Sequence, residues 1–378
     1  MIFPDAMLGM LGGGQLGRMF TLAAHSMGYR VTVLDPDPLS PAGAIADVHL
    51  KAAYQDREAL QQLADTCAAV TTEFENVPAD SLRWLSSHCT VRPAGDAVAV
   101  AQDRIREKAF VQSCGIAVAP YAVIEKETDL DAVDAGLFPG ILKRARFGYD
   151  GKGQTRVADA AEARRGFNDM GAEPCVLEQR IALKCEISAV VARGADGIGR
   201  SFPVAENRHR NGILDVSIVP ARVAPELMRR AEQWALKIAE KLDYCGVLAV
   251  EFFVTGDDRL LVNEMAPRPH NSGHYTIDAC TTSQFEQQVR TLCGLPLGDT
   301  RLLAPAAMLN LLGEAWRNGQ PPWERVFGMP EAKLHLYGKH EARDGRKMGH
   351  CTMLGATPDV ALEKALIVRN VLYPDWKD

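Results

Sequence analysis

Paired metal-binding cysteines, long apolar runs and an excess of positive charge are all missing from this chain. Its nine cysteines are scattered and never spaced Cys-x-x-Cys, so we expect reduced thiols, with neither a zinc site nor a disulfide framework. No uncharged apolar run is long enough to span a membrane. The N-terminus lacks the basic segment and the small-residue cleavage pattern of a signal peptide. These absences predict a cytoplasmic protein.

The charge balance argues against one broad class of partner. Lysine and arginine number 42 against 48 aspartates and glutamates, and the resulting net charge of −6 disfavours nucleic acid as the main partner. A local basic pocket for a small anion is compatible with this charge. The 378 residues, 47% hydrophobic and 24% charged, predict a globular protein of two or three domains.

A glycine motif follows the first apolar run. Residues 12–17 read Gly-Gly-Gly-Gln-Leu-Gly, residues 18–27 have helical spacing, and a second strand-like run ends at Asp35. This order meets the requirements of a dinucleotide-binding βαβ unit, so an NAD-dependent dehydrogenase is one hypothesis. The motif alone is weak evidence, because any phosphate ligand can use the same turn and helix N-terminus.

Two acids follow the next apolar run, residues 68–72. Ligands of open α/β sheets bind at the carboxyl ends of the strands, so we expect Glu73 to reach a ligand. We expect Glu75 to be an acid at the start of the helix predicted over residues 77–85. The charges of residues 102–110 are expected to face solvent on an amphipathic helix.

A second glycine-rich stretch, residues 147–154, lies between strand-like runs at 140–143 and 155–157. Its glycines allow backbone N–H groups to turn toward an anion, and Lys152 together with the upstream Lys143 supplies positive charge. The spacing is not that of a Walker A loop. A plain hairpin turn is the alternative, and the stretch alone does not decide between the two.

Two strands, residues 246–254 and 259–265, are predicted to form a hairpin that carries Glu251 and Glu264 on opposite arms. Facing carboxylates in apolar surroundings repel unless a cation lies between them. Mg²⁺ is the predicted cation, with Asn263 as a third oxygen ligand. Exposed edge acids are the alternative. The donor-rich stretch 267–274 follows at once and suggests a second, anionic substrate.

The order of these motifs resembles the ATP-grasp superfamily, and within it the enzymes that carboxylate 5-aminoimidazole ribonucleotide with ATP and bicarbonate in purine biosynthesis. The matching segments are 13–19, 73–78, 102–104, 148–154, 263–274, 337–339 and 345–350. The resemblance implies an α/β and α+β ATP-grasp fold. Its parts would be a Rossmann-like pre-ATP-grasp domain over 1–101, an ATP-grasp domain with a glycine-rich lid over 102–300, and a small β-rich domain over 301–378.

The resemblance also implies roles for individual residues. Those implied to bind ATP are Arg104, Lys143, Gly148, Tyr149, Asp150, Gly151, Lys152, Gly153, Gln154, Glu178, Gln179, Arg180, Ile181, Glu186, His209, Asn263 and Glu264. Those implied to bind the imidazole ribonucleotide are Gly14, Gln15, Leu16, Glu73, Asp150, Arg268, His270, Asn271, Lys339 and Arg346. The implied catalytic residues are Tyr149, Asp150, Lys143 and Arg268, and the implied Mg²⁺ ligands are Glu251, Glu264 and Asn263.

The implied reaction is phosphorylation of bicarbonate by ATP to carboxyphosphate. The exocyclic amine then attacks carboxyphosphate or the CO₂ that it releases, with Asp150 as the candidate that orients the amine or takes its proton. ATP and Mg²⁺ are the implied cofactors, and the family suggests a homodimer. Formate-dependent glycinamide ribonucleotide formyltransferase is the alternative within the superfamily. A dehydrogenase would leave the glutamate hairpin unexplained, and a non-catalytic nucleotide-binding protein is the third alternative.

Overall fold

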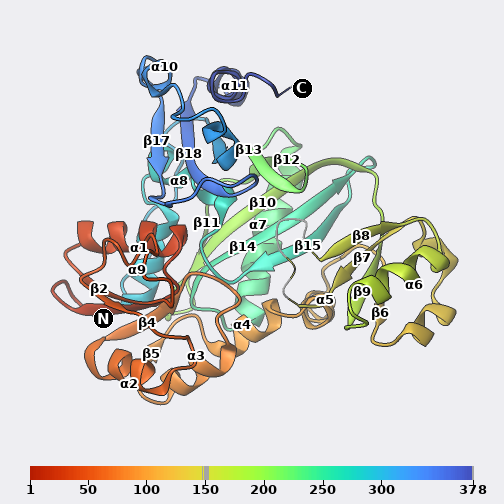
Figure 1. Cartoon of the computed structure of the whole chain (residues 1–378), viewed down its shortest axis with the longest axis horizontal. Helices are drawn as coiled ribbons and strands as arrows, with labels where there is room; N and C mark the ends of the chain where they lie inside the picture. The colour runs from red at the N-terminus through yellow and green to blue at the C-terminus, as the bar shows by residue number, and fades with distance from the viewer. Residues whose placement is uncertain (147, 149–152, 377–378) are drawn as a thin grey trace.

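The computed structural model describes residues 1–146, 148 and 153–376 and contains three β-sheets (Figure 1). The N-terminal sheet lies at the left of the view, a small sheet with its helices lies at the right, and the largest sheet runs between and above them. Within the described ranges, no helix combines the length and the apolar character needed to cross a bilayer. The mixed α/β and α+β architecture agrees with the prediction.

The N-terminal sheet has five parallel strands, which confirms the predicted βαβ unit. Its central strands are apolar and buried, as expected where crossover helices cover a parallel sheet. In spatial order, its strands are β3 (Val48–Leu50), β2 (Arg30–Leu34), β1 (Met7–Leu11), β4 (Ala69–Thr72) and β5 (Thr90–Val91), and the helices are α1 (Gln15–Ser26), α2 (Arg57–Thr66), α3 (Ala79–Ser86) and α4 (Gly95–Ala101).

The small sheet has four strands and carries the second glycine-rich stretch between β7 and β8, which pair antiparallel. Its elements are β6 (Tyr121–Ile124), β9 (Cys175–Gln179), β7 (Gly140–Arg144), β8 (Gln154–Val157), the helix α6 (Ala160–Asp169) and the 3₁₀ turns η1 (Glu127–Ala132) and η2 (Ala135–Leu137). The helix α5 (Arg104–Ser113) precedes this sheet, and the Asp103 side chain caps it by accepting from the backbone N–H groups of Ile105 and Arg106.

The largest sheet includes nine strands of the described chain. Eight follow one another in the order β15 (Leu260–Ala266), β14 (Gly246–Thr255), β10 (Leu183–Arg193), β12 (Ala205–Arg210), β13 (Ile213–Val219), β16 (Ala306–Leu312), β18 (Lys347–Leu354) and β17 (Lys333–Leu336), while β11 (Gly199–Ser201) pairs with β10. The remaining elements are α7 (Pro225–Lys241), η3 (Asn271–Gly273), α8 (Thr276–Ala279), α9 (Gln284–Cys293), η4 (Gly313–Trp316), α10 (Trp323–Phe327) and α11 (Pro358–Leu372).

The C-terminal strands extend the sheet of the central region, because β16 pairs antiparallel with β13. The strands β16, β17 and β18 agree with the predicted small β-rich C-terminal domain. Residues 301–378 therefore bring their basic loops to the central sheet by strand pairing. The boundaries at 101 and 300 remain a prediction.

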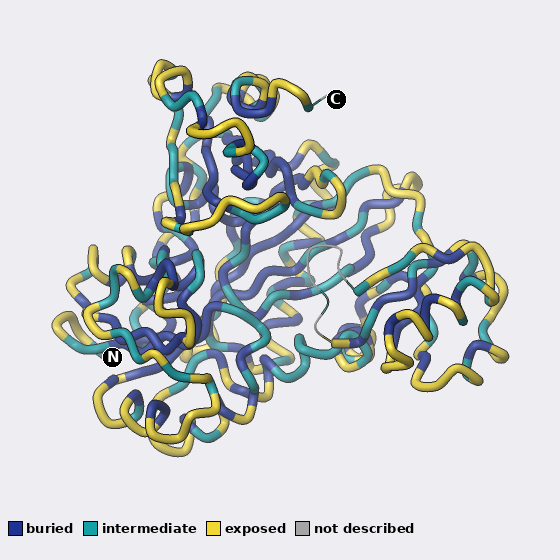
Figure 2. The backbone as a smooth tube through the Cα atoms, in the orientation of Figure 1, coloured by how far each residue is buried: buried dark blue, intermediate teal, exposed yellow. Residues whose placement is uncertain are grey.

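Apolar packing fixes the three regions against one another. Helix α7 lays Ala231, Ala235 and Ile238 on β10 and β14, and each fully buried large apolar side chain is worth roughly 1.5–3 kcal/mol. Helix α9 packs Phe285 and Val289 into the core that α1 and β1 form, so a helix of the central region supports the N-terminal sheet. Figure 2 shows the buried backbone along the central strands and the exposed backbone at the periphery.

Candidate active site

A cleft of about 1590 Å³ is lined by all three regions of the chain. Gly13 and Glu73 border it from the N-terminal sheet, Lys143 and Glu251 from the central region, and Lys339 from the C-terminal loop. Small-molecule pockets usually measure roughly 300–1,000 Å³. The cleft is therefore large enough for two ligands side by side.

The hairpin of β14 and β15 provides the carboxylates at the floor of this cleft. Glu251 and Glu264 are direct cross-strand partners, which confirms the predicted pairing. The Nε2 atom of His270 lies 3.0 Å from Oε1 of Glu251, and Nη1 of Arg104 lies 2.8 Å from Oε2 of Glu264. The Oδ1 atom of Asn263 is buried and accepts no hydrogen bond from any described residue.

Burial by itself would raise the pKa of the Glu251 carboxyl, but the contact with His270 and the charges of His209 and Lys347 leave this pKa below its ordinary value. Glu251 is therefore ionised at neutral pH. Carboxylate and amide oxygens are the hard ligands that Mg²⁺ prefers. The residues present, including the unpartnered amide oxygen of Asn263, fit such an ion.

A second polar cluster lies beside Glu251 on the neighbouring strands. Glu186 on β10 and His209 on β12 form an ion pair, with Nδ1 of the histidine 3.3 Å from Oε2 of the glutamate. Candidate ligand atoms of Glu186, His209 and Glu251 lie within 4.8 Å of one another. Burial lowers the pKa of His209, but the hydrogen bond to Glu186 and the charges of Glu186 and Glu251 together leave it above its ordinary value. The sequence predicted both residues at the ATP site, and both line the cleft.

Lys143 and Lys108 share the buried carboxylate of Glu178. Each lysine Nζ lies 2.9 Å from one of its two oxygens. Burial raises the pKa of Glu178, but Lys143 and then Lys108 lower it to about 2, so the group carries one negative and two positive charges. Lys143 and Glu178 were predicted for ATP, and both line the cleft.

The expectation that the charges of residues 102–110 face solvent is wrong for two of them. Glu107 and Lys108 are 3% and 1% exposed. The carboxylate of Glu107 accepts a hydrogen bond from the backbone N–H of Met265 at 2.6 Å, which ties α5 to β15. Both residues follow Arg104 at helical spacing, and this shared face was the sequence signal for them.

The second glycine-rich stretch is described only at its two ends. Gly148 and Gln154 line the cleft, and Gly153, with φ of +73°, accepts a hydrogen bond from the backbone N–H of Arg144. The positive φ explains why glycine is needed at 153. The predicted site residues Tyr149, Asp150, Gly151 and Lys152 lie outside the described residues. On the other wall, the predicted residues Gln179, Arg180 and Ile181 line the cleft.

The backbone N–H groups of the N-terminal glycine motif are hydrogen-bonded to two carboxylates that follow strands of the same sheet. The N–H group of Gly13 donates to Asp35 at 2.6 Å, that of Gly17 donates to Glu73 at 2.7 Å, and that of Gly14 also donates to Glu73. Burial raises the pKa of Glu73, and these N–H donors oppose the shift. In a dinucleotide site the same N–H groups would face the pyrophosphate. Glu73 therefore caps α1, which disfavours the dehydrogenase hypothesis.

The approach of Glu73 depends on glycine at two positions. A Cβ atom added at Gly12, which has φ of +102°, would lie 2.4 Å from the Glu73 side chain, and one added at Gly14 would lie 2.5 Å from its Oε1. The predicted substrate residues Gly14, Gln15, Leu16 and Glu73 still line the cleft. Glycine is therefore needed at these two positions to let the Glu73 carboxylate approach the backbone next to the cleft.

The expectation that Glu75 is an acid at the start of the next helix is wrong. It forms an ion pair with Arg268, and this pair joins the N-terminal region to the loop after β15. Burial raises the pKa of Glu75, but Arg268 lowers it to about 2. The predicted residues Arg268, His270 and Asn271 all line the cleft. Both amide atoms of Asn271 are buried without a hydrogen bond to any described residue, which fits a ligand contact.

The predicted phosphate-binding residues of the C-terminal loop also line the cleft. The Nζ atom of Lys339 donates to the backbone carbonyl of Lys347 at 2.7 Å, and Nη1 of Arg346 donates to that of Glu341 at 2.9 Å. These contacts hold the two basic side chains on one loop.

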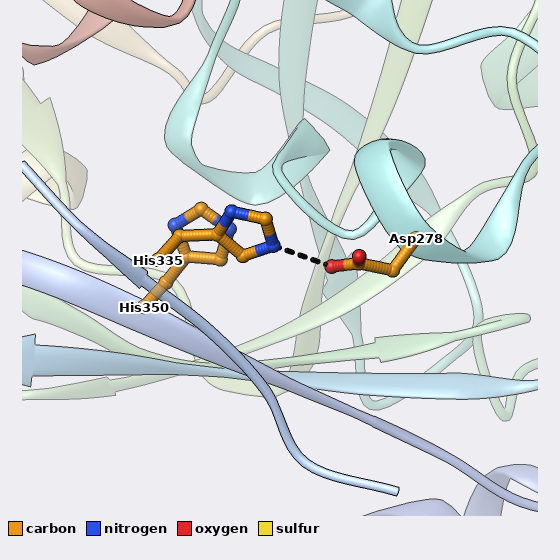
Figure 3. A group of neighbouring side chains, drawn as sticks. All are labelled: Asp278, His335 and His350. Carbon is orange, nitrogen blue, oxygen red and sulfur yellow. Dashed lines mark hydrogen bonds and ion pairs between the residues drawn. The ribbon is translucent and has the colours of Figure 1, made fainter.

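A partly buried cluster of Asp278, His335 and His350 includes two residues, His335 and His350, that flank this loop in the sequence (Figure 3). The rings of His335 and His350 stack with centroids 4.5 Å apart and planes at 15°, and Asp278 accepts from His335 at 2.8 Å. Burial lowers the pKa of His350 well below its ordinary value, and its Nδ1 lies 3.0 Å from the Tyr337 hydroxyl. Parallel rings do not aim their lone pairs at one metal ion, as ligation requires. The cluster therefore braces the chain two residues before Lys339.

Three family models match consecutive parts of the chain. The ribonucleotide synthetase preATP-grasp domain matches residues 6–102, the ATP-grasp domain matches 109–285, and the phosphoribosylaminoimidazole carboxylase C-terminal domain matches 306–364. The N5-carboxyaminoimidazole ribonucleotide synthase of Bacillus subtilis is 46% identical over 359 residues, which cover 95% of this chain and 94% of the relative. This chain belongs to the N5-carboxyaminoimidazole ribonucleotide synthase family.

Solved structures of this synthase family have the same fold. The N5-carboxyaminoimidazole ribonucleotide synthetase of Thermus thermophilus superimposes with a TM-score of 0.89 at 40% identity, over 98% of this chain and 100% of that one. The Aspergillus clavatus synthase, in complex with ADP and 5-aminoimidazole ribonucleotide, has a TM-score of 0.89 at 31% identity, over 98% and 99%. The predicted ATP-grasp fold with its flanking domains is confirmed.

Proposed function

We propose that this chain carboxylates the exocyclic amine of 5-aminoimidazole ribonucleotide, with ATP and bicarbonate as co-substrates, in purine biosynthesis. The product is N5-carboxyaminoimidazole ribonucleotide, with ADP and phosphate. The observation that carries the proposal is the shared cleft, which is lined by Arg104 and Lys143 on the predicted ATP side and by Arg268 and Lys339 on the predicted ribonucleotide side. An enzyme that joins ATP chemistry to a ribonucleotide amine needs both sites in one cavity.

The ATP half of the cleft is assigned to the small sheet and the adjoining strands. Lys143 and Arg104 bind the phosphates, Glu186 and His209 border the ribose, and the backbone of the glycine-rich stretch closes over the nucleotide. Glu178, Gln179, Arg180 and Ile181 run along the adenine. Support comes from the position of these named side chains, and of Gly148 and Gln154 from the glycine-rich stretch, on the cleft wall.

Glu251, Glu264 and Asn263 would hold Mg²⁺. Two ionisable carboxylates paired across a hairpin repel each other without a cation, and the Asn263 oxygen has no partner among the described residues. When bound, the ion would neutralise charge on the transferred phosphoryl group. Arg104 contributes positive charge to the same region through its contact with Glu264.

The reaction proceeds in two balanced steps. A bicarbonate oxygen attacks the γ-phosphorus of ATP, ADP leaves, and carboxyphosphate forms. The exocyclic amine then attacks the carboxyl carbon, phosphate leaves, and the amine loses a proton. Asp150 is the proposed proton acceptor and Tyr149 its neighbour at the substrate, both on the stretch outside the described residues. Closure of that stretch would keep water from carboxyphosphate.

The imidazole ribonucleotide half lies between the N-terminal sheet and the C-terminal loop. Gly14, Gln15 and Leu16 border the ligand from α1. Arg268 and Asn271 contact it from the loop after β15. Lys339 and Arg346 bind its 5′-phosphate, supported by their place on one basic loop at the cleft.

We further propose that the enzyme works as a homodimer in the cytoplasm. The free thiols of all nine cysteines support a reducing compartment. Sedimentation of the purified chain at micromolar concentration tests the dimer, and a monomer mass would contradict it.

The reaction itself is tested by ADP release. Purified enzyme with ATP and Mg²⁺ is assayed with bicarbonate plus aminoimidazole ribonucleotide, and separately with formate plus glycinamide ribonucleotide. We expect ADP only from the first pair. ADP from the second pair alone would establish the formyltransferase, and ADP from neither would exclude the carboxylation. Titration with NADH, followed by fluorescence, tests the dehydrogenase and should give no saturable change.

A further inference from the structure

The sheet face that carries Glu251 continues as a row of buried polar side chains. Ser188 on β10 is the cross-strand partner of Glu251, and Asn207 on β12 is the partner of Ser217 on β13. Ser272, from η3, lies over this row. Their exposed fractions are 1% for Ser188, 5% for Asn207 and 0% for both Ser217 and Ser272. Four buried polar groups in a sheet interior need hydrogen bonds to be tolerated.

These groups form one continuous hydrogen-bonded chain. The Ser217 hydroxyl donates to Oδ1 of Asn207 at 2.8 Å, and Nδ2 of Asn207 donates to the Ser188 hydroxyl at 2.9 Å. Ser188 in turn donates to the Ser272 hydroxyl at 2.8 Å, which lies 2.9 Å from Nδ1 of His270. The chain therefore leads from the middle of the sheet to the imidazole.

The backbone fixes the direction of the whole chain. The N–H group of Ser272 points at Nδ1 of His270 at 3.3 Å, so this nitrogen is an acceptor. The Ser272 hydroxyl, which also faces Nδ1, must then donate its hydrogen bond to this nitrogen. Its oxygen in turn accepts the hydrogen bond from the Ser188 hydroxyl. The imidazole proton of His270 consequently sits on Nε2, which lies 3.0 Å from Oε1 of Glu251.

We propose that Ser272 and Ser188, with Asn207 and Ser217 behind them, are positioning residues that hold His270 as the Nε2–H tautomer and thereby fix Glu251 for Mg²⁺. One carboxylate oxygen is occupied by the imidazole, which sets the orientation of the other. This role differs from substrate contact by His270, and it rests on the proposed function only in making Glu251 a Mg²⁺ ligand. Groups that orient metal ligands typically contribute roughly 10–100-fold to metal affinity or activity.

The tautomer is tested on the full chain without any ligand. Selective ¹⁵N-histidine labelling and long-range ¹H–¹⁵N correlation give the tautomer of each ring, and the His270→Gln variant identifies the signal. In the wild type we expect the ring proton on Nε2, with Nδ1 as the unprotonated nitrogen. Ser272→Ala removes the nearer donor to Nδ1, at 2.9 Å, and leaves only the backbone N–H at 3.3 Å, so a share of the Nδ1–H tautomer should appear. A wild-type ring that carries a proton on Nδ1 would overturn the proposal, and so would an unchanged signal in Ser272→Ala.

Kinetics separate positioning from general loss of structure. In Ser272→Ala and Ser188→Ala, the Mg²⁺ concentration for half-maximal ADP release should rise roughly 10-fold. The KM for the imidazole ribonucleotide should change less than about twofold, because its own contacts are intact. The control Ser86→Ala removes a hydroxyl bonded to the Leu82 carbonyl on α3 and should leave both constants unchanged.

Each kinetic outcome decides one claim. An equal rise of both constants, or an unchanged Mg²⁺ requirement in both serine variants, would overturn the positioning role. If wild-type enzyme gave no ADP at any Mg²⁺ concentration, the proposed function would fail instead, while the tautomer measurement would still decide the state of His270.

Discussion

Two pairs of carboxylates border the same cleft and are satisfied in opposite ways. Asp35 and Glu73 in the N-terminal sheet accept hydrogen bonds from backbone N–H groups of the glycine motif. Glu251 and Glu264 in the central hairpin face each other and are held by imidazole and guanidinium groups. The carboxylates of the first pair thus have hydrogen-bond partners within their own region of the chain. The second leaves an oxygen of Asn263 without a partner among the described residues.

The difference indicates how to separate structural from catalytic acids. A carboxylate bonded by fixed backbone donors stabilises a turn, and its loss should appear in the free energy of unfolding. Where a ligand neutralises two facing carboxylates, the loss of one carboxylate should instead lower kcat. The more recognisable glycine motif thus belongs to the structural pair, and the apolar hairpin belongs to the catalytic one.

The sharpest test of the comparison is Glu264→Gln. Loss of one Mg²⁺ ligand should lower kcat for ADP release about 100-fold or more, which corresponds to roughly 2.7 kcal/mol of transition-state stabilisation. The variant should unfold within a few degrees of the wild type, because the relieved repulsion between the facing carboxylates offsets the lost ion pair with Arg104. Glu58→Gln, at an exposed position of α2, is the matched control and should do neither. A near-normal kcat in Glu264→Gln would contradict the assignment of Glu251 and Glu264 as the catalytic pair.

The reciprocal test is Glu73→Gln. The amide keeps one acceptor oxygen but turns its NH₂ group toward a backbone N–H donor of α1, so the free energy of unfolding should fall by about 1–3 kcal/mol. Urea denaturation at pH 7 measures this, again against Glu58→Gln. Turnover of the folded fraction should stay within about threefold of wild type. A variant as stable as wild type but with a 100-fold lower kcat would reverse the assignment.

The sequence predicted the fold well because its signals were local. Apolar runs and turn residues predicted β1, β2 and the β14–β15 hairpin, and the positions of Glu251 and Glu264 on its two arms predicted that they face each other. Contacts between distant segments were beyond such signals. Nothing local to Glu75 indicates its partner Arg268, 193 residues away. The order of the motifs predicted the site residues through the family resemblance. The hydrogen-bonded row behind His270 could not be predicted, because it depends on the register between β10, β12 and β13.

Glu107 offers the smallest and most specific test, because it adds a third carboxyl to the central group. Burial is the main cause that raises its pKa to about 8; Arg104 lowers the pKa, and Glu264 raises it further. The folded protein therefore binds this proton more tightly than the unfolded chain, whose glutamate pKa is near 4.5. The resulting stabilisation is complete below about pH 4.5 and is lost as the pH rises through about 8.

Glutamine cannot ionise, so Glu107→Gln does not lose this stabilisation as the pH rises. Its amide oxygen can still accept the hydrogen bond from the backbone N–H of Met265. The free energy of unfolding of the variant, relative to wild type, should therefore rise by roughly 1 kcal/mol or more between pH 5 and pH 9. Urea denaturation at both pH values measures the difference, and Glu58→Gln should show no such trend. A constant difference between variant and wild type would mean that Glu107 is ionised throughout, and that the central carboxylates are as well satisfied as those of the N-terminal sheet.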